Sequence, residues 1–177
     1  MASMILRTLI VVVAVICGLL IYAATRPATF HIERSLTMAA PPEKVFALIN
    51  DLHAWPRWAP QDREDSTMKR VFSGAPSGVG AVCDWEGRGT SGKGTLTIVE
   101  SDAPRKVVVQ ADWVNPFKTR NMNEFVLEPD GTGTRVTWSM SGPNLFMMKV
   151  MSVFTNMDKM MGKHFEDGLS NLKTVAE

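Results

Sequence analysis

The sequence has little cysteine, little histidine and almost no surplus of charge, and each shortage argues against a class of protein. Its 177 residues include two cysteines, Cys17 in an apolar run and Cys83 in a predicted strand, so we expect no disulfide framework. His31, His53 and His164 stand apart without metal-ligand spacing, which argues against a zinc or di-metal site. The net charge of +1, with no run of either sign, indicates no nucleic-acid partner. No cofactor is expected.

Motifs for covalent catalysis are missing as well. No nucleophile-elbow pattern occurs, and Cys83 lies on an apolar strand face, where a buried and inert thiol is expected. The glycine-rich stretch at 87–95 invites comparison with a phosphate loop, but its spacing is wrong and it joins two predicted strands, which favours a hairpin. By strand parity Asp84, Glu86 and Glu124 point away from the apolar faces, so no acid/base pair is predicted inside the domain.

A long apolar run, by contrast, occupies the N-terminus. Residues 9–24 carry no charge. Counting from Ile5, with Arg7 reaching the headgroups, gives about twenty residues, enough to span a hydrocarbon core. A cleaved signal peptide is the alternative, but a bulky residue occupies the −3 position for a cut after either alanine at the end of the run. Lipoprotein processing at Cys17 is disfavoured because that residue lies in the middle of the run.

These features predict two parts of the chain. Residues 1–27 form an N-terminal anchor and linker that meets the membrane through residues 5–24, and residues 28–177 form a ligand-binding domain. A short head before the span and a long chain after it favour a single-pass protein whose domain lies on the extracytoplasmic side.

Alternating segments separated by turns predict an antiparallel sheet after the linker. A period of two between apolar residues indicates half-buried strands. The predicted strands are 29–38, 67–73, 79–87, 92–100, 105–114, 118–129 and 134–140. A short helix follows the first of them, with Pro42 at its first helical position and Val45, Phe46 and Ile49 on one face.

The C-terminus changes to a helical period. Apolar residues there recur every three or four positions, which predicts one long amphipathic helix. They are Val150, Phe154, Met157, Met161, Phe165, Leu169 and Leu172. A curved sheet with one apolar face closed by such a helix is an α+β arrangement, and it commonly leaves a cavity between sheet and helix.

The segment RSLTMAAPPEKVFALINDLHAWPRWAP resembles the opening of the START-like superfamily, also called the Bet v 1-like or SRPBCC group, particularly its polyketide cyclase/dehydrase and lipid-transport branch. The matching positions are Ala40, Pro41, Glu43, Val45, Phe46, Asp51, Trp55, Trp58 and Pro60. The later stretches GKGTLTIVESDAPRKV, GTRVTWSMSG and GKHFEDGLSNLK resemble the middle strands and closing helix of that branch. This resemblance implies a helix-grip fold, a curved antiparallel sheet wrapped around a long C-terminal helix, here preceded by an N-terminal transmembrane helix.

Strand parity turns three tryptophans toward the expected cavity, and methionines gather in the facing helix. The cavity candidates are Trp85, Leu96, Ile98, Trp113, Asn123, Phe125, Trp138, Met140, Phe154, Met157 and Met161. Asn121 shares their parity and could present a further polar contact. Trp55 and Trp58, stiffened by Pro56 and Pro60, are predicted to clamp the end of the core, with a secondary place at the cavity mouth. The alternative is that these aromatic and methionine residues only fill the hydrophobic core and bind no ligand.

Three functions remain open, because this superfold hosts carriers, cyclases and co-chaperone-like domains. The first is a membrane-anchored domain that binds a hydrophobic small molecule or lipid without covalent chemistry. The second is a polyketide cyclase or dehydratase-type enzyme in which a group such as Asn123 or His164 assists proton transfer. The third is a protein-interaction module. The sequence favours the first, and it leaves the ligand and the oligomeric state open.

Overall fold

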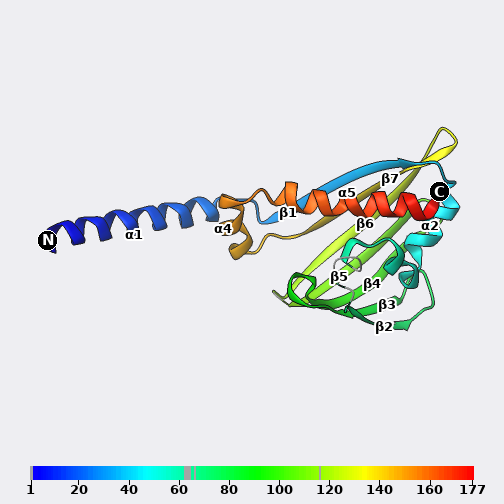
Figure 1. The fold of residues 1–177 in the computed structure, drawn as a ribbon, viewed down its shortest axis with the longest axis horizontal. Coiled ribbons are helices and arrows are strands. Elements are labelled where there is room, and N and C mark those ends of the chain that lie inside the picture. The colour runs from blue at the N-terminus through cyan, green and yellow to red at the C-terminus, as the bar shows by residue number, and fades with distance from the viewer. Residues whose placement is uncertain (1, 62–64, 66, 116) are drawn as a thin grey trace.

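A computed structural model describes residues 2–61, 65, 67–115 and 117–177. The chain begins with α1 (Ala2–Ala24), a helix that projects from one end of a domain built from a curved sheet and further helices (Figure 1). Its apolar stretch Ser3–Ala24 is long enough and hydrophobic enough to cross a membrane. At 1.5 Å per residue the 23 residues of α1 extend about 35 Å, slightly more than a typical hydrocarbon core.

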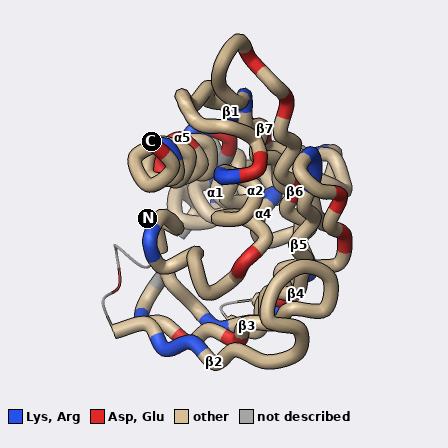
Figure 2. Tube along the Cα trace, turned by 90° about the vertical axis from the view of Figure 1, so that its right-hand side faces the viewer, with Lys and Arg blue, Asp and Glu red and all other residues tan. Residues whose placement is uncertain are grey.

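Seven antiparallel strands form one sheet in the order β1-β7-β6-β5-β4-β3-β2. They are β1 (Thr29–Met38), β2 (Lys69–Gly74), β3 (Ala81–Glu86), β4 (Lys93–Asp102), β5 (Lys106–Asn115), β6 (Thr119–Asp130) and β7 (Gly133–Pro143). Consecutive strands from β2 to β7 pair as a meander, and β1 closes the far edge against β7. Seen from the end, the sheet curves around the helices that cover its inner face (Figure 2).

Two helical segments fill one end of this curve. The helix α2 (Pro42–Asn50) starts with a proline whose missing N–H costs nothing at that position, and it buries Val45, Phe46 and Ile49. The 3-10 helix η1 (Leu52–Arg57) follows at once, and the backbone N–H of His53 donates to the carboxylate of Asp51, which caps it. A further short 3-10 turn, η2 (Gly89–Ser91), connects β3 and β4, so the glycine-rich stretch there is a hairpin connection.

The predicted C-terminal helix is divided in two. α4 (Phe146–Phe154) ends where Thr155 takes an extended conformation, and α5 (Met157–Ala176) begins after Asn156, whose side chain accepts from the Lys159 N–H at 2.9 Å. The apolar stripe that the sequence assigns to one helix therefore splits, with Val150 and Phe154 on α4. α5 is the helix that the sheet grips, and it lies chiefly along β1 (Figure 1).

Candidate functional site

Strand pairing decides which side chains share the inner face of the sheet. Trp85 pairs with Gly94, Gly94 pairs with Trp113, and Phe125 pairs with Trp138. Since directly opposed residues of an antiparallel pair point to the same face, these aromatic side chains and their alternating neighbours all line the face that α2 and α5 cover.

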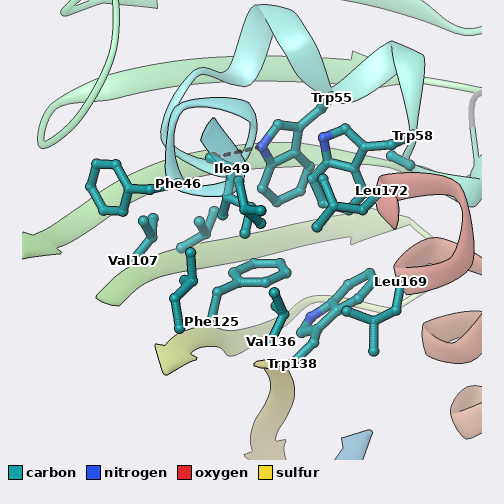
Figure 3. Packing of buried hydrophobic residues seen from close by; sticks show 14 of the residues in the cluster. Phe46, Ile49, Trp55, Trp58, Val107, Phe125, Val136, Trp138, Leu169 and Leu172 are labelled. Carbon is teal, nitrogen blue, oxygen red and sulfur yellow. Dashed lines mark hydrogen bonds between the residues drawn. The ribbon is translucent and has the colours of Figure 1, made fainter. Parts of the chain in front are cut away.

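Aromatic rings fill the inner face at the end where α2 lies. Ile98, Phe125 and Trp138 are 0%, 0% and 4% exposed and belong to the main core cluster. The Trp138 ring stacks on Phe165 of α5, with ring centroids 4.3 Å apart. It also forms an edge-to-face contact with Trp58, with centroids 6.0 Å apart (Figure 3). This half of the space between sheet and helix is therefore solid core.

Trp55 and Trp58 lie in that same core. The indole N–H of Trp55 donates to the Ile49 carbonyl at 2.9 Å, and that of Trp58 donates to the Leu48 carbonyl at 3.2 Å. The side-chain amide of Asn171 on α5 donates to the backbone carbonyl of Trp58 at 3.1 Å. The two tryptophans thus tie α2, the sheet and α5 together, and both belong to the main core cluster.

The more open end of the inner face lies near the connection between β5 and β6. Trp85 and Trp113 form a separate edge-to-face pair with ring centroids 5.0 Å apart, outside the main core cluster. Glycines make room for them: a Cβ on Gly94 would lie 2.4 Å from the Trp85 ring, and one on Gly92 would lie 3.1 Å from the Trp113 ring. Trp113 and its neighbour Leu96 are only half-buried, so this end of the face offers apolar surface.

Polar atoms without a protein partner accompany this apolar surface. The Trp113 indole N–H, the Thr119 hydroxyl and the Asn121 side-chain oxygen are buried, and none forms a hydrogen bond with another described residue. Trp113 pairs directly with Thr119, and Asn121 lies two residues further on the same face. Such groups are stabilised when a partner supplies the missing hydrogen bonds. The arrangement can therefore hold the polar end of a mostly apolar molecule.

Asn123, next on the same face, already has a partner. Its side-chain oxygen accepts from the Trp138 indole N–H at 3.2 Å, at the boundary between the solid core and the more open end. Both asparagines are buried, at 7% exposure each.

Arg34 of β1 fixes α5 along the other edge of the face. Its guanidinium contacts Asp158 and Glu166, each at 3.0 Å. Gly162 allows this approach, because a Cβ there would lie within 1.9 Å of the guanidinium. The hydrogen bonds from Arg34 lower the pKa of Asp158 and raise the pKa of Arg34. From the sequence, strand parity places Arg34 on the inner face of the first strand. Its partners Asp158 and Glu166 are distant in the chain, so the sequence does not indicate these ion pairs.

Two hollows lie at the end of the domain that carries α1. One, of about 560 Å³, lies between the start of β1 and the junction of α4 and α5, and includes Arg26, Phe30, Ser152 and Phe154. The other, of about 650 Å³, lies beside the paired ends of β1, β6 and β7 and includes Met122 and several neighbours. The first hollow touches the start of α5 through Asp158, and neither hollow includes Trp113, Leu96 or Asn121.

The remaining cavity candidates are distributed unevenly. Leu96, Met140 and Met161 lie on the inner face or pack against its core. Phe154 does not, because it belongs to α4 and is 70% exposed. Met157 is the first residue of α5, and its side chain lies outside the described part of the structure. Thr119 is not among the residues predicted from the sequence, although it shares the strand parity of Asn121.

Comparisons with solved structures agree on the fold. A major latex-like protein from Panax ginseng aligns with a TM-score of 0.63 at 13% identity, covering 85% of this chain and 99% of that chain. The di-domain ARO/CYC protein BexL of the BE-7585A biosynthetic pathway aligns with a TM-score of 0.62 at 14% identity, covering 88% of this chain and 52% of that chain. The Aha1 protein from Colwellia psychrerythraea aligns with a TM-score of 0.55 at 18% identity, covering 84% and 96%. A comparison with curated protein sequences finds no match.

The curved seven-stranded antiparallel sheet gripping a C-terminal helix defines a START-like, or Bet v 1-like, domain, as the resemblance implied. Residues 29–177 match the family described as polyketide cyclase / dehydrase and lipid transport, and the chain belongs to it. The match begins directly after α1 and its linker, so the apolar helix lies outside the family's domain.

Proposed function

We propose that this protein is a membrane-anchored carrier that binds a hydrophobic small molecule or lipid on the inner face of its sheet, without covalent chemistry. The observation that carries the proposal is the row of Trp113, Thr119 and Asn121, three buried polar groups without a partner among the described residues, beside half-buried Leu96. An apolar surface with a few converging polar groups is what a largely apolar ligand needs.

The hydrogen-bonding capacity of Trp113, Thr119 and Asn121 limits the chemistry of the ligand. The Trp113 N–H can only donate, the Asn121 oxygen accepts, and the Thr119 hydroxyl can do either. A ligand with a hydroxyl or carbonyl at one end of an apolar body can satisfy them, whereas a hydrocarbon without a polar atom leaves them unpaired. All three groups are neutral, so they suit hydrogen bonding and orientation better than proton transfer.

Two further points support the membrane assignment. α1 is apolar, exposed over most of its length and joined to the domain through a short linker, as an anchor would be. Residues 1–27 are then anchor and linker, residues 28–177 are the binding domain, and the domain lies on the extracytoplasmic side. The family description includes lipid transport, which is compatible with a ligand drawn from the bilayer.

Replacing Leu96 by arginine tests the binding face. The full chain is purified in a mild detergent, and the apolar molecules that remain with it are extracted and quantified per mole of protein. Leu96→Arg places a charge on the inner face, and we expect its content of bound ligand to fall by about tenfold or more. Thr97→Arg is the matched control, because Thr97 is the next residue of β4 and points to the outer face. Equal ligand content in both variants and the wild type would refute binding at this face.

A further inference from the structure

The helix α4 exposes large apolar side chains, while its two polar side chains are half-buried. The four most exposed are Phe154 at 70%, Met147 at 54%, Phe146 at 52% and Met151 at 46%. Lys149 and Ser152 are half-buried, as are the apolar Met148, Val150 and Val153, and no residue of α4 is fully buried. A helix on a water-facing surface has the reverse arrangement, with polar side chains outward. Contact with water therefore does not explain the orientation of α4.

The position of α4 indicates what covers this face. α4 packs against the domain end of α1 (Figure 1). Ala23, near that end of α1, is completely buried. The neighbouring α1 residues Leu20 and Ile21 stay exposed, as do the outward residues of α4. An exposed apolar patch of this kind marks a surface for a protein or for a membrane. Because α4 lies at the domain end of a helix long enough to span a bilayer, a bilayer that holds α1 also reaches α4.

We propose that α4 is an interfacial helix, whose face of Phe146, Met147, Met151 and Phe154 inserts into the same bilayer that α1 spans. This proposal rests on the proposed anchoring by α1. An amphipathic helix in the interface buries its apolar face roughly 5–10 Å into the boundary between headgroups and acyl chains. Two contacts, one spanning and one lying flat, would hold the domain in one orientation instead of letting it tumble on a single anchor.

That orientation matters for the proposed ligand. The strand ends that carry Trp113, Thr119 and Asn121 lie at the same end of the sheet as the start of β1, since Asn121 neighbours Gly142 and Gly142 pairs with Phe30. α1 and α4 attach at this end, directly before β1 and after β7. With α4 in the interface, the more open end of the inner face is turned toward the bilayer, from which an apolar ligand can enter without crossing water.

Spin-label accessibility in lipid vesicles tests the position of α4. The full chain with Cys17→Ala and Cys83→Ala carries one nitroxide at a time, at Ile10 of α1, Met151 of α4 or Met160 of α5. Met160 is the matched control, because it is an exposed methionine that belongs to the domain and not to the proposed interface. Oxygen, which concentrates in lipid, and a water-soluble nickel chelate are compared as relaxation agents in vesicles of phosphatidylcholine with about one-third phosphatidylglycerol.

We expect oxygen to dominate at Ile10 and Met151 and the nickel chelate to dominate at Met160. Dominance of the nickel chelate at Met151, with oxygen still dominant at Ile10, would overturn the interfacial helix and leave the anchor intact. If neither oxygen nor the nickel chelate reaches the nitroxide at Met151, a protein surface covers α4 instead of lipid. That result would also overturn the interfacial helix. Nickel access at Ile10 would refute the anchor itself, and the interfacial helix with it.

Discussion

Replacing Trp138 by alanine is expected to destabilise the domain by about 3–5 kcal/mol. Its ring stacks on Phe165, lies 5.0 Å from Phe125 and meets Trp58 edge-on, so truncation leaves a cavity where β7, η1 and α5 converge. The Asn123 side chain would also lose the indole N–H that it accepts from. For a domain of this size that loss corresponds to a fall in Tm of roughly 6–20 °C. Thermal unfolding of the full chain in detergent, followed by near-ultraviolet circular dichroism, measures it.

Trp113→Ala is the matched control for that result. Trp113 is also an inward tryptophan of the sheet, but it is half-buried and lies outside the main core cluster. Its loss is expected to cost about 1–2 kcal/mol and to reduce ligand retention instead. If Trp113→Ala unfolds the domain as readily as Trp138→Ala, the division of the inner face into a solid core and a more open end is wrong.

Deleting residues 1–27 is expected to move the protein from the membrane to the soluble fraction while leaving the domain folded. No residue of α1 belongs to the main core cluster, and the helix contacts the domain chiefly through α4. The full chain should stay in the membrane pellet after an alkaline carbonate wash, and residues 28–177 should appear in the supernatant. Their Tm should agree within about 3 °C, which corresponds to roughly 1 kcal/mol.

The mass of the protein recovered from cells separates the two explanations of the apolar helix. A mature chain that keeps residues 2–24 supports the anchor. A chain that begins after Ala23 or Ala24 would contradict it, because the segment would then be a signal sequence. A large loss of Tm in the shortened protein would instead show that α1 stabilises the domain in a way that its contacts do not suggest.

Strand parity, the alternation of side chains between the two faces of a strand, predicted most of the residues on the inner face of the sheet. The alternation of Trp85, Trp113 and Trp138 with polar neighbours follows directly from the pleat, and the structure pairs these residues or their neighbours on one face. Parity gives the face of a side chain, but not how deeply another element covers it. The sequence therefore grouped Phe125 with Trp113, although Trp55 and Trp58 pack on Phe125 and bury it, whereas Trp113 is only half-buried.

The C-terminal helix shows a second limit. The apolar period continues across the break at Thr155, because Phe154 on α4 and Met161 on α5 fall on one extended stripe. A side-chain cap from Asn156 ends that continuity, and a single Asn in a helical pattern is a weak signal. The orientation of α4 could not be predicted, since the outward face of a helix depends on what it packs against. The unpaired polar atoms at Trp113 and Asn121 likewise emerge only from the three-dimensional arrangement.

Photo-crosslinking from the inner face tests whether a hydrophobic ligand binds between the sheet and the helices. Benzoylphenylalanine replaces Leu96 in one variant of the full chain and Thr97 in the other, and both are irradiated in native membranes before the protein is analysed by mass spectrometry. The two positions are adjacent on β4 and face opposite sides of the sheet. We expect adducts of lipid size from position 96 and few from position 97. Adducts of equal yield at both positions, or none at position 96, would contradict a hydrophobic ligand on the inner face.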